Sequence, residues 1–225
     1  MTRSKLRIMY TLILLITSLF ASEAQPPNLM RETPINPGEV LDFRLSYGWF
    51  TVGHARWVTD KYLKTYEGEE CYKFKVTAES TGLLGVFATV DDEWGEYMRT
   101  DNYLPMMAYR DLVEGKYVLD EKTHFNYSDS SILYTRIRKG KPLPDETLKM
   151  DKPRVGMLGG FMMMRSVDYF KHKKGDKINI EAFFEGEEYN MEVEYAGVVE
   201  LKSKVGKLRA HKIIPKLPDN RLFPG

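Results

Sequence analysis

A period-two alternation of apolar and polar side chains is the feature that most limits the fold, and it recurs from Val40 to Ile214. In residues 38–50, every second side chain is apolar: Leu41, Phe43, Leu45, Tyr47 and Trp49. Successive side chains of a strand point to opposite faces, so each such segment predicts a strand with one buried face. About ten such segments, separated by short turns, predict a mainly β fold: a curved antiparallel sheet or half-barrel of about ten strands.

Residues 155–170 depart from this pattern. Apolar side chains there recur at helical spacing, at Met157, Phe161 and Met164. This spacing predicts one principal helix near 156–170. Gly159 and Gly160 weaken the helix by about 1 kcal/mol each relative to alanine. A methionine-rich helix beside a sheet is either a packed part of the core or the adaptable wall of an apolar pocket.

The first 24 residues have the pattern of a cleavable secretory signal. Three basic residues, Arg3, Lys5 and Arg7, precede an apolar run. That run has about 13 residues, fewer than the roughly 20 that a membrane-spanning helix needs. Small residues at Ser22 and Ala24 favour a cut before Gln25. We therefore expect a signal peptide over residues 1–24, a periplasmic or extracellular protein, and no transmembrane segment after cleavage.

The rest of the chain has the length of one domain with a real core. Residues 25–37 hold four prolines and predict an extended lead-in, and residues 38–225 predict a single β-rich domain. The single cysteine, Cys71, has no partner for an internal disulfide and lies in an alternating stretch. We interpret it as a packed residue, so the fold must depend on core packing and hydrogen bonds.

The overall charge is close to neutral. The full chain has 33 Lys and Arg against 32 Asp and Glu. Loss of residues 1–24 would remove three basic residues and one acidic residue, which leaves 30 against 31. This balance provides no electrostatic argument for nucleic acid, or for anionic lipid headgroups, as a partner.

Motifs for metals, cofactors and nucleophiles are missing from the sequence. Four histidines, His54, His124, His172 and His211, are far apart and have no partner at metal-ligand spacing. There is no GxSxG motif and no glycine-rich phosphate loop. We therefore expect neither a metal nor a cofactor, and assign no catalytic residue.

The densest acidic cluster is Asp91, Asp92 and Glu93. On a strand, Asp91 and Glu93 would share one face, and paired carboxylates can cleave glycosidic bonds. The alternative is an acidic surface patch, which the sequence favours.

Four stretches resemble an exported bacterial family known as domain of unknown function 3108: residues 37–57, 80–98, 103–117 and 157–180. They correspond to an opening hairpin, a strand with an aspartate before an aromatic residue, a Leu-Pro pair before a strand, and a helix before a Gly-Asp turn. The resemblance implies an exported β-rich domain with no established activity. A more distant likeness, in fold alone, is to lipoprotein carriers of the LolA/LolB kind, and fold by itself does not establish function.

Members of this family continue past the region that resembles residues 211–223 with another hairpin, whereas this sequence stops at Gly225. The resemblance therefore predicts that a C-terminal hairpin is missing and that the chain continues beyond Gly225.

These observations favour a non-catalytic binding or carrier protein of the cell envelope, with an apolar groove for a lipid or another hydrophobic ligand, or with an envelope protein as its partner. The expected ligand-binding residues are Trp57, Phe87, Met162, Met163 and Arg165. The arginine would contact an anionic headgroup, or else pair with a carboxylate of the sheet. The alternatives are a carbohydrate-active hydrolase that uses the acidic pair and a structural module of the envelope.

Overall fold

The computed structural model describes residues 35–47, 49–82, 89–203 and 206–216. The chain divides into two compact units. Among the described residues, one unit contains residues 35–162 and 183–188, and the other contains residues 163–182 and 189–216.

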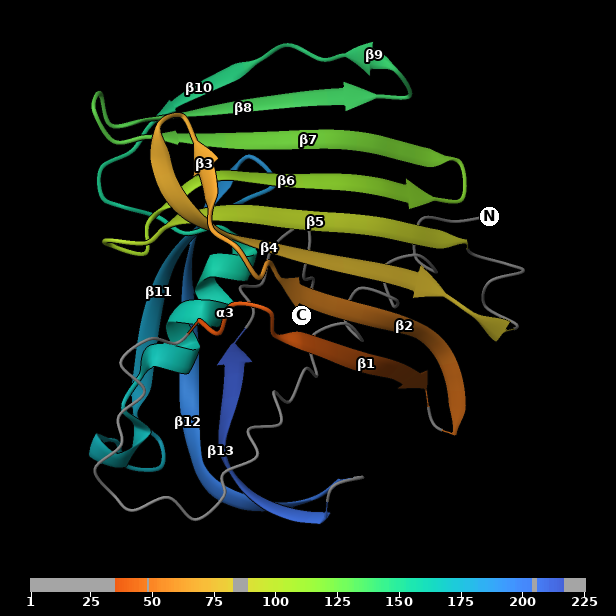
Figure 1. Ribbon diagram of the computed structural model, residues 1–225, viewed down its shortest axis with the longest axis vertical. Coiled ribbons are helices and arrows are strands. Elements are labelled where there is room, and N and C mark those ends of the chain that lie inside the picture. Colours follow the sequence, from red (N-terminus) through yellow and green to blue (C-terminus); the bar gives the residue numbers. More distant parts are fainter. Residues whose placement is uncertain (1–34, 48, 83–88, 204–205, 217–225) are drawn as a thin grey trace. The chain divides into compact units, whose positions relative to one another are not determined.

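The first unit is built on an antiparallel sheet of ten strands (Figure 1). They are β1 (Val40–Tyr47), β2 (Phe50–Thr59), β3 (Lys64–Tyr66), β4 (Glu69–Ser80), β5 (Val90–Arg99), β6 (Pro105–Glu114), β7 (Tyr117–Asn126), β8 (Ser131–Arg138), β9 (Lys141–Pro142) and β10 (Glu146–Lys149). The order is β1-β2-β4-β5-β6-β7-β8-β10, with β3 paired to β4 and β9 to β8. This open sheet confirms the prediction of a mainly β fold with about ten antiparallel strands.

A smaller sheet has the order β11-β12-β13. Its strands are β11 (Lys177–Phe184), β12 (Glu187–Ser203) and β13 (Gly206–Lys216). Most of its residues belong to the second unit. There the ring of His211 lies between aromatic side chains, and its Nδ1 is 2.7 Å from the hydroxyl of Tyr195.

The helix α3 spans Met157–Ser166, and a short 3-10 turn, η1, spans Tyr169–Lys171. The prediction of one helix near 156–170 is therefore confirmed in position but was too long at its C-terminal end. The reason is local, because the side chain of Asp168 accepts a hydrogen bond from the backbone N–H of Phe170 and begins a new turn.

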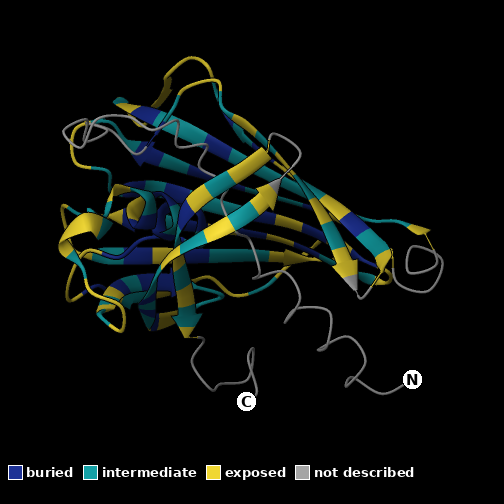
Figure 2. Cartoon of the chain, turned by 90° about the horizontal axis from the view of Figure 1, so that it is seen from below, coloured by how far each residue is buried: buried dark blue, intermediate teal, exposed yellow. Residues whose placement is uncertain are grey.

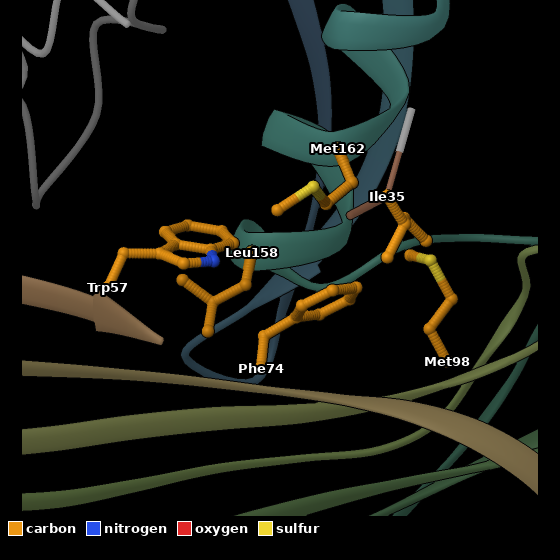
Figure 3. Packing of buried hydrophobic residues seen from close by; sticks show 6 residues of the cluster. All are labelled: Ile35, Trp57, Phe74, Met98, Leu158 and Met162. Carbon is orange, nitrogen blue, oxygen red and sulfur yellow. The ribbon is translucent and has the colours of Figure 1, made fainter. Parts of the chain in front are cut away.

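A hydrophobic core forms between one face of the larger sheet and the start of α3. Its buried members are Ile35, Trp57, Phe74, Met98, Leu158 and Met162 (Figure 3). Ile35 belongs to the segment that the sequence assigned to an extended lead-in. Cys71, on the other face of β4, is a buried free thiol as predicted, and burial raises its pKa to about 11.

Burial alternates along most strands, as Figure 2 shows. A second cluster lies further along the same sheet and comprises Phe125, Ile132, Tyr134, Met150 and Phe183. Among the helices of the described residues, none is long and apolar enough to span a membrane.

Candidate functional site

The residues predicted to bind a ligand lie in different surroundings. Trp57 and Met162 are buried members of the core in Figure 3, and the ring of Trp57 is 5.8 Å from that of Phe74. Met163, the next residue of α3, is 42% exposed, and Arg165 is half-buried. Phe87 lies outside the described residues. Two of the five side chains are therefore covered by the protein itself, and the ligand contact stays a prediction.

The acidic cluster is divided between the two faces of β5. Asp91 and Glu93 share one face, as the alternation predicts, and Asp92 lies on the other. Glu93 accepts hydrogen bonds from the hydroxyl of Tyr109 at 2.9 Å and from Nζ of Lys75 at 3.1 Å. These partners are typical of a surface polar network, and a hydrolytic role stays an untested prediction.

A row of charged side chains lies on the buried face of the same sheet. All of its members are less than 10% exposed: Asp92, Glu96, Arg110, Glu114 and Glu121. The row was not predicted from the sequence, although one signal was present: its residues occupy the same alternate strand positions as the apolar residues of the core face. Burying charged groups is costly unless they are paired or neutralised. The partner or the protonation state of each of these side chains therefore determines the chemistry of this face.

Arg110 of β6 is the positive centre of the row. Its Nε and Nη2 donate to the two carboxylate oxygens of Glu121, at 3.0 and 2.7 Å, and its Nη1 donates to Glu185 at 2.6 Å. The guanidinium lies against the rings of Trp94 and Phe184, with its Cζ 5.4 and 4.5 Å from the ring centroids. Two carboxylates and two aromatic faces leave this arginine fixed in place.

Glu121 of β7 accepts a further hydrogen bond besides those from Arg110. The hydroxyl of Tyr134 on β8 donates to its Oε2 at 2.5 Å, the same oxygen that accepts from Nη2 of Arg110. The pairing of β6 with β7 places Arg110 opposite Glu121, so sheet register alone brings the ion pair together.

Glu96 of β5 is 1% exposed and has no cationic partner in the part of the chain that the structure describes. Its Oε2 accepts the backbone N–H of Gly159 at 3.0 Å, in the first turn of α3, where helical N–H groups have no partner within the helix. A Cβ at Gly156 would lie 2.4 Å from Oε2, and a Cβ at Gly159 would lie 2.4 Å from Oε1. Glycine is thus required at both positions for Glu96 to fit, which explains why a helix tolerates Gly159.

Burial raises the pKa of Glu96 from 4.5 to about 7, although the backbone N–H of Gly159 lowers it. Burial, and next the charge of Glu114, raise the pKa of Asp92 from 3.8 to about 7. Both groups therefore bind a proton more tightly in the folded chain than in the unfolded chain. The chemistry that this face offers is proton uptake.

A small pocket lies beside Glu96, lined also by Trp94, Arg110, Glu121 and Thr123. About 20 Å³ of it is accessible to the centre of a water molecule. Since a water needs roughly 10–15 Å³ by this measure, the pocket holds about one water and no fatty chain. Oε1 of Glu96 makes no hydrogen bond to the described residues. A water there would satisfy this oxygen, whereas a substrate would find no room.

Within the described ranges, no group of three His, Cys, Asp or Glu side chains is placed to hold a metal ion. His124 is instead 2.9 Å, at its Nδ1, from the hydroxyl of Tyr66. Burial lowers the pKa of His124 and favours its neutral form.

The turn between β1 and β2 carries two exposed aromatic rings. Trp49 is 88% exposed and Phe50 is 57% exposed, and their ring centroids are 5.5 Å apart. We use the term Trp49 end for the end of the larger sheet at which this turn lies, where its strands begin or finish. Because the strands are antiparallel, the β6–β7 and β8–β9 turns lie at the same end, at the right of the sheet in Figure 1.

Substitution of Gly159 by alanine tests the glycine cradle of Glu96. The new Cβ would meet Oε1 of Glu96 and, at 2.8 Å, Cε of Met98. We expect the free energy of unfolding to fall by roughly 1–3 kcal/mol through overpacking, despite the gain of about 1 kcal/mol in helix propensity. Urea unfolding measures this change. In an Glu96→Ala background the same substitution should cost much less, and an equal cost in both backgrounds would contradict the cradle.

Comparison with known proteins places the chain in one family. No curated protein matches it, and no solved structure matches it. The family model described as "Protein of unknown function (DUF3108)" matches residues 42–225, well over half of the chain. The resemblance found in the sequence is thereby confirmed at the level of the family, and the chain belongs to the DUF3108 family of proteins of unknown function.

Proposed function

We propose that this chain is a non-catalytic binding protein of the cell envelope, which contacts lipid through its surface at the Trp49 end of the larger sheet. The observation that carries the proposal is the pair of exposed, adjoining rings of Trp49 and Phe50 at a hairpin tip. Export, and with it the envelope location, is a prediction from residues 1–24.

The two rings have a large free energy to gain by leaving water. An aromatic side chain buries roughly 150–250 Å², and apolar burial contributes about 25 cal/mol per Å². With Trp49 88% exposed and Phe50 57% exposed, complete burial would contribute on the order of 5 kcal/mol for Trp49 and about 2–3 kcal/mol for Phe50. Tryptophan is also the side chain that prefers the boundary between lipid and water, because its ring is apolar and its indole N–H is polar. A hairpin tip presents both rings without any rearrangement of the sheet.

The described interior next to Glu96 supports lipid binding less well than the exposed rings do. The pocket beside Glu96 has room for about one water, and Trp57 and Met162 pack within the core. An apolar groove and a likeness to carriers of the LolA/LolB kind remain predictions from sequence, and the proposal does not depend on either. The burial of Glu96, which is 1% exposed, also favours a non-catalytic role for this carboxylate, because a substrate could contact little of it.

Replacing both Trp49 and Phe50 with alanine tests the proposal. We expect the wild-type protein to co-sediment with phosphatidylcholine vesicles and the double variant to lose at least about tenfold in partitioning, since a tenfold loss needs only 1.4 kcal/mol of the ring burial. The matched control is the double variant Tyr62→Ala and Leu63→Ala, which removes an exposed aromatic and an exposed aliphatic side chain (70% and 44%) in the loop between β2 and β3. Equal partitioning by the Trp49 variant and the wild type would refute the proposed function.

A further inference from the structure

The Trp49 end of the sheet also gathers positive charge. The turns beside β6 and β8 carry four exposed basic residues: Lys116, Arg138, Lys139 and Lys141. Within two residue pairs of this end, the exposed acidic residues of β4 to β8 are Glu79 and Asp91, while the exposed Asp111 and Asp120 lie one residue pair further in. Glu114 of this end is buried. Basic residues therefore exceed exposed acidic ones where the exposed rings lie.

The opposite end of the same sheet has the reverse character. Two of its basic residues are paired with neighbouring carboxylates, Arg99 with Asp101 at 2.7 Å and Lys64 with Asp60 at 3.3 Å, and two further lysines, Lys61 and Lys149, are exposed. Its turns further expose three acidic residues: Glu67, Glu70 and Asp129. The whole chain is nearly neutral, but its charge is unevenly distributed: among the described residues, the Trp49 end of the sheet is net basic and the opposite end is net acidic.

Building on the proposed function, we infer that the Trp49 end docks on a bilayer that carries anionic headgroups. Trp49 and Phe50 enter the lipid boundary, while Lys116, Lys139 and Lys141 contact lipid phosphates. An anionic surface attracts this end and repels the other, so the charge pattern also sets the orientation of the sheet, with its strands running toward the membrane.

The distances suit such a surface. Neighbouring strands are separated by roughly 4.8 Å, so the five steps from β2 to β8 place the basic turns within roughly 24 Å of the aromatic tip, across a few lipid headgroups. A ten-residue strand is roughly 33 Å long, which exceeds the Debye length of about 8 Å at physiological salt several times. The acidic end is therefore screened from a surface that the basic end touches, and the local charge decides the attraction.

The test compares vesicles of pure phosphatidylcholine with vesicles that also contain phosphatidylglycerol. We expect the wild-type protein to partition more strongly into the anionic vesicles, and added salt to remove the difference. The double variant Lys139→Glu and Lys141→Glu should lose at least about tenfold in partitioning into anionic vesicles and little in neutral ones. The control variant, Lys61→Glu with Lys149→Glu, reverses two exposed lysines away from this end and should bind like the wild type.

The two vesicle types separate the failure of this inference from failure of the proposed function. Equal binding to neutral and anionic vesicles, lost on removal of Trp49 and Phe50, would overturn the anionic preference and leave the proposed function intact. Equal loss in the two charge-reversal variants would overturn the assignment of the basic turns. Absence of binding to both vesicle types would overturn the inference and the proposed function together.

Discussion

At pH 8 the Glu96→Gln variant should be more stable than the wild-type protein, by about 3 kcal/mol, and at pH 4 the two should be nearly equal. A pKa raised from 4.5 in the unfolded chain to about 7 in the folded chain corresponds to a free energy of about 3 kcal/mol. Glutamine keeps a carbonyl oxygen for the N–H of Gly159 and has no charge to bury. Urea unfolding at a series of pH values measures the difference in the free energy of unfolding between the variant and the wild type.

The direction of this pH dependence follows from the number of protons that the folded and unfolded chains bind. Between about pH 4.5 and pH 7 the folded chain keeps a proton at Glu96 that the unfolded chain has released. The folded state binds more protons in this range, so the free energy of unfolding falls as the pH rises through it. Asp92 acts in the same direction, because its pKa is raised from 3.8 to about 7. The Glu96→Gln variant should keep the dependence that Asp92 causes and lose the part due to Glu96.

A suitable control is Glu79→Gln, which removes an exposed carboxylate from the adjacent strand β4. Its unfolding free energy should follow that of the wild type across the pH series. A constant gap between the Glu96→Gln variant and the wild type at all pH values would show that Glu96 does not take up a proton on folding.

Replacement of Arg110 by methionine should produce the second large effect, a loss of about 3–5 kcal/mol in the free energy of unfolding at neutral pH. The substitution retains much of the volume against Trp94 and Phe184 but leaves the carboxylates of Glu121 and Glu185 without their cation. Removing one partner of a buried pair strands the other charge in a poorly solvated place. Chemical unfolding of the variant measures the loss.

Two comparisons make this result specific. Adding Glu121→Gln to Arg110→Met should recover part of the stability, because one stranded charge is removed with the arginine. Arg56→Met removes an exposed ion pair, in which Arg56 and Asp42 have side chains 60% and 64% exposed, and should leave the free energy of unfolding almost unchanged, because water screens such a pair. Similar losses for the two arginines would contradict a buried role for Arg110.

The sequence was most informative where the cause is local. The alternation from Val40 onward depends only on the pleat of a strand, so it predicted the strands and the shared face of Asp91 and Glu93 without knowledge of their partners. Helical spacing placed α3 for the same reason, and the end of α3 was missed because the capping role of Asp168 was not recognised. The residues matched to the family could likewise be recognised from sequence alone.

What only the tertiary structure decided is which side chains from distant strands meet. The register of β6 and β7 places Arg110 opposite Glu121. The turn between β11 and β12 brings Glu185 to the same arginine, and the start of α3 brings the N–H of Gly159 to Glu96. Period-two patterning says that a side chain lies on one face, but the patterning cannot tell whether that face is covered. Trp57 was therefore predicted from the sequence to contact a ligand, whereas the structure packs it in the core. The basic turns and the exposed ring of Trp49 are far apart along the chain. They lie at one end of the sheet because every second turn of an antiparallel sheet falls at the same end.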